Sequence, residues 1–341
     1  MLHFNPKEII AAASDAIALI AGGNVSRPHP IANQLSMREV ARGFGIAKDP
    51  HYAAGRDDRT VEAFGLMTSD FSQALIRGLL PLAVVAYYGQ AEHLSFVSKK
   101  EVVDFKPVNI PAVDMDVDLE LIGEGAEVSH FSAVLSGGAR EVALASFGRT
   151  LTLSRVAMVN NEMLALGQLF ASAGGSAARL ESRLVAAAME GNPTLDDGKL
   201  VFGSEYSNVL TGVDGAFSNV AAAKAAAMLR KQPTESGQRA DLRAKHLVVE
   251  PELEMFARSF VKEYDPEIKV SVLAGLPDGR WYLMADPTLA PTVGVLRLAG
   301  MKDPVTAKKP MERMSGDGIH TRVIADLGAC LLRRIGIVRG G

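Results

Sequence analysis

The 341-residue sequence predicts an α+β fold in a chain long enough for about two packed units. Three observations predict this class. Apolar residues recur at helical spacing up to about residue 90, alternate with a period of two from about residue 92 to 155, and return to helical spacing from about residue 160. Towards the C-terminus a strand, a helix and further strands follow one another, an order that indicates an α+β domain.

The N-terminal stretch predicts two helices. Asn5 can cap a first helix with Pro6 at its first position, and Ser36 with Glu39 three residues later has the spacing of a capping box. The segment "KDPHYAAGRDDRT" that follows is polar and turn-rich. We therefore expect residues 1–65 to form an arm with two small helices and no core of its own.

A third helix and a region of strands come next. The helix is predicted by "TSDFSQALIRGLLPLAVVAYYG", in which Pro81 and Gly89 disturb the helical spacing. Four strand patterns follow, separated by turn signals: "HLSFVSKKEVVDFKPVNI", "VDMDVDLELI", "EVSHFSAVLS" and "EVALASFGRTLTLS". Because a two-stranded hairpin is only marginally stable in water, we expect these long hairpins to be supported by another subunit.

The longest predicted element is a helix between Asn160 and Gly191 that passes through a flexible Gly174-Gly175 pair. Roughly thirty residues at about 1.5 Å each give a length of about 45 Å, so this helix is a candidate backbone for the molecule. The remaining predicted elements are the helices "GAFSNVAAAKAAAMLRKQ" and "PELEMFARSFVKEY", the strand "HLVVE", strands within "VSVLAGLPDGRWYLMADPTLAPTVGVLRLAG", and a last run from His320 to Val338.

Composition excludes several classes of protein. The chain has 36 basic and 39 acidic residues and a net charge of −3, without a basic stripe, which argues against tight DNA binding. Cys330 is the only cysteine, so an intrachain disulfide and a cysteine-based zinc site are excluded, and we expect it to be a small buried hydrophobe. We find no apolar run close to the roughly 20 residues that span a bilayer, and expect neither a membrane span nor secretion.

An acid occupies every second position of "DMDVDLEL": Asp114, Asp116, Asp118 and Glu120. In a strand these carboxylates share one face, about 6.6 to 7 Å apart, which is too far for neighbours to hold one ion. A catalytic carboxylate pair needs a cleft with contrasting environments, which an exposed hairpin lacks. A face that meets solvent or a partner is therefore favoured over a metal clamp or an acid/base pair.

Motifs for chemistry are absent from the sequence. It has no G-x-S-x-G, H-E-x-x-H or phosphate-loop pattern, and "IGEGAE" lacks the third glycine of a dinucleotide fingerprint. Four of the histidines are isolated in sequence: His93, His130, His246 and His320. We therefore predict a protein that is not an enzyme, with no catalytic residues, cofactor or metal.

An ordered set of segments resembles a known family. The segments are "TSDFSQALIRGLLPLAVVAYYG", "VDFKPVNI", "LELIGEGAEV", "FGRTLTLSRVAMVNNEMLALG", "NVAAAKAAAMLRKQPTESGQ", "KHLVVEPELEMFARSFV" and "RWYLMADPTLAP", covering about residues 36 to 338. Together they resemble the major capsid proteins of tailed double-stranded-DNA bacteriophages, the Hong Kong 97-type family, in the subgroup often fused to a prohead protease.

The resemblance implies a division of the chain. Residues 1–65 would be the N-terminal arm, and residues 92–152 the extended loop that reaches over a neighbouring subunit. Residues 66–91, 153–191 and 318–341 would form the peripheral domain, with the spine helix at about 160–190. Residues 192–317 would form the axial domain, whose tips meet around the capsomer axes.

The resemblance also implies a function. Copies would assemble into pentamers and hexamers, and these into an icosahedral shell around the genome, in the cytoplasm of a bacterial host. Partners would be the portal, a scaffold or separate maturation protease and possible decoration proteins, with only weak, non-specific DNA contact. Candidate inter-subunit contacts are the four acids above and Lys99, Lys100 and Lys106, which lie near the loop where some relatives form lysine–asparagine crosslinks.

Two alternatives stay open. An encapsulin-like nanocompartment shell would have the same fold and enclose an enzyme instead of DNA. A metal-dependent enzyme using the acidic strand belongs to a different class, and stoichiometric binding of a divalent ion by a monomer would distinguish it.

Overall fold

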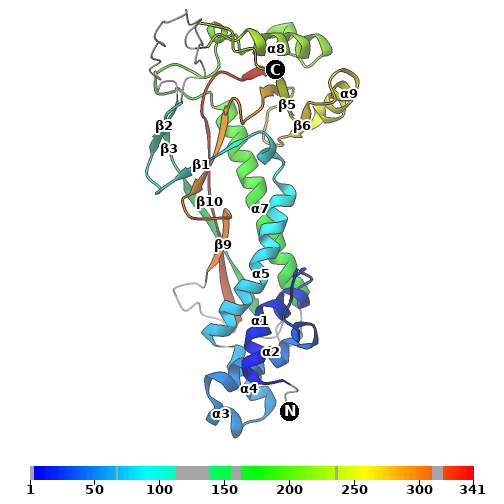
Figure 1. Ribbon diagram of the computed structural model, residues 1–341, viewed down its shortest axis with the longest axis vertical. Helices are drawn as coiled ribbons and strands as arrows, with labels where there is room; N and C mark the ends of the chain where they lie inside the picture. The colour runs from blue at the N-terminus through cyan, green and yellow to red at the C-terminus, as the bar shows by residue number, and fades with distance from the viewer. Residues whose placement is uncertain (1–3, 67, 113–137, 155–162, 235–236, 309–317) are drawn as a thin grey trace, which may run out of the picture. The chain divides into compact units, whose positions relative to one another are not determined.

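The computed structural model describes residues 4–66, 68–112, 138–154, 163–234, 237–308 and 318–341 (Figure 1). The chain divides into two compact units. Unit 1 comprises Met1–Gln90, Ser146–Ala178 and Lys302–Ala325, and unit 2 comprises Ala91–Ala145, Arg179–Met301 and Asp326–Gly341. Helices and strands both contribute to the described residues, so the predicted α+β class is confirmed.

The described N-terminal residues of unit 1 form four α-helices: α1 (Pro6–Ile20), α2 (Met37–Lys48), α3 (Pro50–Ala54) and α4 (Asp58–Leu66). The predicted caps are confirmed, because Asn5 and Ser36 each form a capping box with the glutamate three residues later. Apolar side chains on the helices are fully or almost fully buried, among them Ile9, Ile17, Val40 and Phe44. These side chains also pack on the next helix of unit 1, where the ring of Phe71 meets that of Phe44 edge-on at 5.8 Å.

The two predicted helices are confirmed, but the segment contains two more. The polar residues taken as turns belong to α3 and α4. Asp49 caps α3 by accepting a hydrogen bond from the Tyr52 N–H at 2.8 Å. In α4, Gly65 packs so closely on α2 that a Cβ there would lie 1.7 Å from the carbonyl oxygen of Ala41. The polar side chains were misread because they cover the exposed sides of these short helices.

The predicted third helix is α5 (Ser69–Gln90), which continues through Pro81. Among the described residues, α5 is the helix that is long and apolar enough to cross a membrane, so the expectation that no stretch comes close was wrong. Its buried side chains recur at helical spacing and include Phe71, Leu75, Leu79, Ala83 and Tyr87. The core of unit 1 therefore accounts for much of its apolar character.

The predicted long helix is confirmed as α7 (Met163–Glu190). Its first half belongs to unit 1, and there Gly174 packs against α5. A Cβ on Gly174 would lie 1.8 Å from the carbonyl oxygen of Ala83. The glycine pair of the sequence thus permits close helix packing and does not interrupt the helix.

The first and last of the four strand patterns fall on described residues. They form β1 (Ser98–Val102), β2 (Val108–Ile110), β3 (Ala139–Val142) and β4 (Ala145–Ser154). β2 and β3 pair in an antiparallel hairpin, but β1 pairs in parallel with β8 (Val293–Leu298). In unit 2, Val102 of β1 is buried with Leu296 and Cys330, so this strand is supported by its own chain. The second and third patterns lie outside the described residues.

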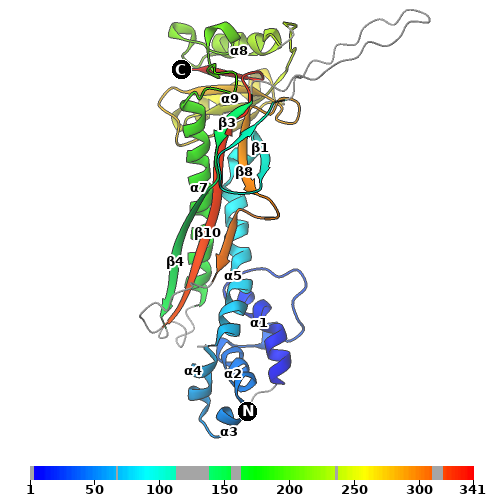
Figure 2. The same cartoon turned by 90° about the vertical axis from the view of Figure 1, so that its left-hand side faces the viewer.

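β10 (Gly318–Leu331) is the central strand of that sheet. It pairs with β8 on one side and with β4 on the other, and Figure 2 shows β4 and β10 side by side. β9 (Val305–Lys308) pairs with it in an antiparallel manner within unit 1. The predicted last run from His320 to Val338 falls on β10 and on β11 (Ile337–Gly340), with a break between Leu331 and Ile337.

Unit 2 contains a second sheet, with strand order β11-β7-β5-β6. Its strands are β5 (Ala244–Val249), β6 (Lys269–Val272), β7 (Trp281–Ala285) and β11 (Ile337–Gly340). Alternate β7 residues face opposite layers. Trp281 and Leu283 pack with α8 (Asn219–Lys231) and α9 (Glu254–Tyr264), whereas Tyr282 and Met284 pack with the last turns of α7. The sheet therefore has a buried core on both faces.

Candidate functional site

The residues predicted as inter-subunit contacts fall in two groups. Asp114, Asp116, Asp118 and Glu120 lie outside the described residues. Lys99 and Lys100 are consecutive residues of β1, so their side chains leave from opposite faces; Lys99 is exposed and Lys100 half-buried. Lys106 is exposed in the following turn, where its backbone N–H donates to Oδ1 of Asp104 at 3.1 Å.

Three buried polar residues of unit 2 form a cluster, which we call the Glu181 cluster. It joins Glu181 of α7, Arg297 of β8 and His93 of the 3-10 turn η2 (Glu92–Ser95); these residues are 0%, 7% and 1% exposed. Arg297 binds both carboxylate oxygens of Glu181, with Nη2 donating to Oε2 at 3.0 Å. Nε2 of His93 lies 2.8 Å from the same Oε2.

This arrangement indicates a structural role. A buried carboxylate is stable only when it is paired and hydrogen-bonded, and a two-point arginine contact meets that need. A carboxylate oxygen only accepts hydrogen bonds, so Nε2 of His93 is the donor in this contact. Because Glu181 is fully buried, it has no surface on which a substrate could bind. The cluster therefore fastens three chain segments together.

A second group of polar contacts lies at the end of α7. The hydroxyl of Tyr282 donates to Oε1 of Glu190 at 2.6 Å, and Nε of Arg280 lies 2.9 Å from the same oxygen. Burial, followed by the contact with Glu190, raises the pKa of Tyr282 above its usual range. Tyr282 therefore stays protonated and serves as a hydrogen-bond donor.

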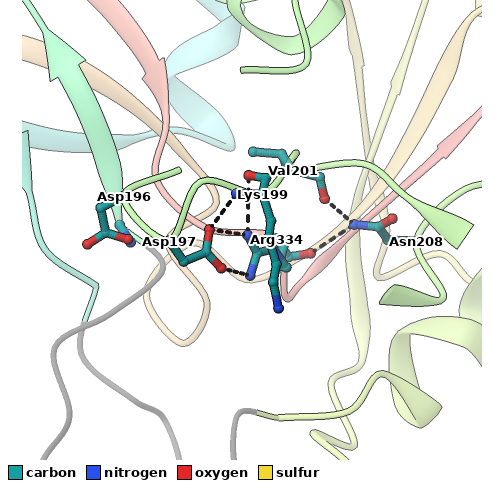
Figure 3. A network of polar contacts seen from close by, with 7 residues as sticks. Asp196, Asp197, Lys199, Val201, Asn208 and Arg334 are labelled. Atoms are coloured by element: carbon teal, nitrogen blue, oxygen red, sulfur yellow. Dashed lines mark hydrogen bonds and ion pairs between the residues drawn. The ribbon is translucent and has the colours of Figure 1, made fainter. Parts of the chain in front are cut away.

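A third network holds the segment after α7 (Figure 3). Asp197 accepts hydrogen bonds from Nη1 and Nη2 of Arg334 at 2.7 and 2.9 Å, and one from the Lys199 N–H at 3.0 Å. The hydrogen bonds from Arg334 are the main cause that lowers the pKa of Asp197. The Arg334 guanidinium also lies over the ring of Tyr206, 4.4 Å from its centroid. This contact combines charge pairing with stacking.

Two neighbours complete the network in Figure 3. Asp196 exchanges two hydrogen bonds with Gly138: it accepts from the Gly138 N–H at 2.9 Å and donates its own N–H to the Gly138 oxygen at 3.1 Å. Asn208 is fully buried, donates to the Val201 oxygen at 2.8 Å and accepts from the Gly203 N–H at 3.0 Å. All of these polar groups are used to fix backbone segments.

Two of the histidines that are isolated in sequence have side-chain partners in the fold. His93 belongs to the Glu181 cluster, and Nδ1 of His320 lies 3.0 Å from the hydroxyl of Thr152 within unit 1. His246 is buried, and burial lowers its pKa. His130 lies outside the described residues. Because these partners lie far away in the sequence, the residues around each histidine did not predict the contacts.

Unit 2 has a half-open cavity of about 350 Å³ between β3, the end of α7 and the end of β10. Its walls are mostly small apolar groups and include Cys330. Burial raises the pKa of the Cys330 thiol to about 12, so the thiol stays protonated and unreactive. The expected buried hydrophobe is thus confirmed for Cys330. Among the described residues, no three His, Cys, Asp or Glu side chains gather where they could hold a metal ion.

Comparison with known proteins identifies the family. A sequence model described as phage capsid protein matches residues 139–340, more than half of the chain. The chain belongs to the phage capsid protein family. The predicted capsid role is confirmed: the chain is a structural protein of the virion capsid and associates with copies of itself.

Several solved structures are similar to this capsid protein at low sequence identity. A virus-like particle from Pyrococcus furiosus is 11% identical, with 78% of this chain and 99% of that chain covered and a TM-score of 0.47. A structure of Mycobacterium phage Adephagia is 10% identical, with coverages of 74% and 89% and a TM-score of 0.48. The holo-SrpI encapsulin complex from Synechococcus elongatus is 10% identical, with coverages of 72% and 85% and a TM-score of 0.46. No curated protein sequence matches the chain.

The sequence contained one unused signal for the buried charges. Glu181 lies on the apolar stripe of α7, four residues after buried Ala177 and four before buried Val185. A lone acid on the buried side of a helix predicts a buried partner. The partner itself, Arg297, is 116 residues away, and helical spacing contains no information about it.

Proposed function

We propose that this capsid protein is the major head protein of a tailed double-stranded-DNA bacteriophage, with the Hong Kong 97-type fold. Copies associate as pentamers and hexamers, which close into an icosahedral shell around the genome. The observation that carries this proposal is the phage capsid family match over residues 139–340. The order of elements in the described chain supports it, with a 28-residue helix followed by an α+β unit.

We assign the parts of the chain accordingly. Residues 1–65 act as an arm, residues 92–152 as a loop over a neighbouring subunit, and residues 192–317 as the axial domain. Residues 66–91, 153–191 and 318–341 make the peripheral domain around the spine helix. The four acids from Asp114 to Glu120 face basic groups of a neighbour or the virion exterior, and Lys99, Lys100 and Lys106 contact an adjacent subunit.

The polar chemistry supports a purely mechanical role. The Glu181 cluster, the Glu190 contacts and the Asp197 network all tie segments of the chain to one another. A balanced charge of −3 suits a shell wall with weak, non-specific contact with DNA. Assembly takes place in the host bacterial cytoplasm with portal, scaffold or maturation protease and decoration proteins as partners.

Negative-stain electron microscopy of the purified protein tests this function. Closed shells or ring-shaped capsomers are the expected result, and a protein that remains monomeric at every concentration would contradict it. Particles isolated from infected or induced cells should contain nuclease-protected DNA. Particles filled with a protein cargo would identify the encapsulin-like alternative instead.

A further inference from the structure

Asp-Gly dipeptides occur four times in the sequence, beginning at Asp197, Asp214, Asp278 and Asp317. An aspartate in front of glycine can close a ring on its own backbone, because glycine has no side chain and its nitrogen reaches the aspartate side-chain carbon with little hindrance. Asp317 lies outside the described residues. The other three lie in unit 2, and their surroundings differ.

The least constrained of the three is Asp278, in the turn between β6 and β7. The Arg280 N–H closes this turn by donating to the Pro277 oxygen at 3.1 Å. Asp278 and Gly279 are both exposed, and Gly279 has a φ of 75°, which glycine adopts without strain. Within the described ranges, neither the Asp278 carboxylate nor the Gly279 N–H has a hydrogen-bond partner. Both reacting groups are therefore exposed and not held by another residue.

Asp197 and the glycine after it are held by hydrogen bonds. The Asp197 carboxylate accepts from both Nη atoms of Arg334, at 2.7 and 2.9 Å. The Gly198 N–H donates to the Leu195 oxygen at 2.9 Å. Gly198 has a φ of 74°, almost the same as that of Gly279. The hydrogen bonds, and not the backbone angle of the glycine, therefore distinguish these two turns.

Asp214 and the glycine after it are held as well. Nζ of Lys224 lies 2.6 Å from Oδ1 of Asp214, and the Gly215 N–H donates to the Gly212 oxygen at 3.0 Å. Gly215 is buried, and its oxygen accepts from Nε1 of Trp281 at 2.8 Å. A hydrogen-bonded nitrogen and a paired carboxylate must be released before they can react with each other. Asp197 and Asp214 should therefore react more slowly than an aspartate without such contacts.

We propose that Asp278 isomerises spontaneously to isoaspartate. The Gly279 nitrogen attacks Cγ of the protonated Asp278 carboxyl group, an N–Cγ bond forms, the C–OH bond breaks, and the hydroxyl leaves with the amide proton as water. Water then cleaves the bond between this nitrogen and the backbone carbonyl carbon of Asp278, so the chain continues through Cγ. One water is released and one is taken up, without oxidation or reduction, and the reaction needs no cofactor or enzyme.

Isomerisation would change the turn beside the polar contacts at the end of α7. The new linkage adds one carbon to the main chain between Asp278 and Gly279, directly ahead of Arg280. Nε of Arg280 lies 2.9 Å from Oε1 of Glu190, and the Arg280 oxygen accepts from the Glu250 N–H at 3.2 Å. A longer connection no longer matches these contacts, so an isomerised subunit should be less stable. The reaction needs only the folded subunit and is independent of the proposed shell function.

Peptide mapping of the full chain after incubation in mildly acidic buffer tests the proposal. Trypsin cuts after lysine and arginine and so places the three sites on separate peptides, residues 184–199, 200–224 and 270–280. Isoaspartate is identified by the changed elution of a peptide of equal mass and by resistance to the protease Asp-N, which cleaves before aspartate but not before isoaspartate. We expect the peptide 270–280 to contain several-fold more isoaspartate than either of the other two.

Two controls complete the test. The same chain unfolded in guanidinium chloride should form isoaspartate at all three sites at comparable rates, because the contacts of the folded state are gone. Asp278→Glu keeps the charge and should remove the signal from residues 270–280, since glutamate would have to close a larger ring. Similar amounts at the three sites of the folded protein would overturn the inference, as would an unmodified Asp278 under conditions in which the unfolded chain reacts.

Discussion

Two glutamate–arginine pairs of unit 2 have similar contact distances in opposite surroundings. In the Glu181 cluster, Nη2 of Arg297 lies 3.0 Å from the carboxylate, and the two side chains are 9% and 0% exposed. On α9, Nε of Arg258 lies 2.8 Å from the carboxylate of Glu254, and these side chains are 52% and 37% exposed. The distances are nearly equal, so distance alone does not rank the two pairs.

Burial and sequence separation rank them. The buried pair has lost its hydration, and it joins residues 116 positions apart on different elements. The exposed pair keeps its water and joins residues four positions apart on one helix, so it contributes little to folding. Unit 2 thus has a buried ion pair that joins distant segments and an exposed ion pair that adds little to folding.

The largest expected effect comes from breaking the buried pair. Glu181→Ala leaves the Arg297 guanidinium buried without its carboxylate and should lower the free energy of unfolding by about 3–5 kcal/mol. Urea denaturation of the dissociated subunit measures it. The double variant Glu181→Leu/Arg297→Met removes both charges and should recover much of the loss. A double variant as unstable as the single one would show that Glu181 acts through packing rather than through charge.

A smaller loss is expected at the end of α7. Tyr282→Phe keeps the buried ring and removes the hydroxyl that donates to Glu190, so the free energy of unfolding should fall by about 1–2 kcal/mol. The exposed Tyr264→Phe removes a hydrogen bond to Asn219 and should cost about 0.5 kcal/mol or less. Thermal unfolding compares the two. Equal losses would mean that burial does not strengthen these hydrogen bonds.

Asp197 forms an ion pair whose burial is intermediate between these two pairs, and its contribution to stability should depend on pH. Its pKa in the folded state is lowered from the ordinary value of 3.8, chiefly by Arg334, so its contribution to stability is present above about pH 4 and is lost as the pH falls below that. Asp197→Asn should therefore cost about 1 kcal/mol at neutral pH and less near pH 3. Asp241→Asn, at an exposed pair with Arg230, is the matched control. If Asp197→Asn lost as much stability near pH 3 as at neutral pH, the charge of Asp197 would not be the cause of the loss.

The smallest effect is expected at the exposed pair. Glu254→Ala removes a salt bridge between i and i+4 on α9, and the free energy of unfolding should change by about 0.5 kcal/mol or less. Calorimetry or urea titration suffices to measure it. A loss above about 1 kcal/mol would show that exposure does not weaken this pair as we expect.

Local interactions explain what the sequence could predict. Asn5, Ser36 and the apolar spacing of α7 act within a few residues of one another, so caps and helices follow from the pattern alone. α3 and α4 were missed because short helices with polar outer sides resemble turns. The sequence also suggested a poorly supported hairpin region, whereas β1 finds its partner β8 almost two hundred residues later.

The candidate site was harder to predict for the same reason. His93 is 88 residues from Glu181, and Arg334 is 137 residues from Asp197, so each pair exists only after the chain has folded. The predicted lysines are described, but nothing in a single subunit tests their contacts. The family, in contrast, was predicted from an ordered set of segments, because order along the chain survives where individual residues change.

Trp281 is an intrinsic fluorescence probe of this protein. It is the only tryptophan of the chain, it is fully buried, and its ring meets that of Phe217 edge-on at 5.2 Å. The wavelength of its fluorescence emission therefore reports whether this point of unit 2 is shielded from water, without an attached dye. Because folding removes the indole from water, the change of this emission with time follows the folding of a subunit.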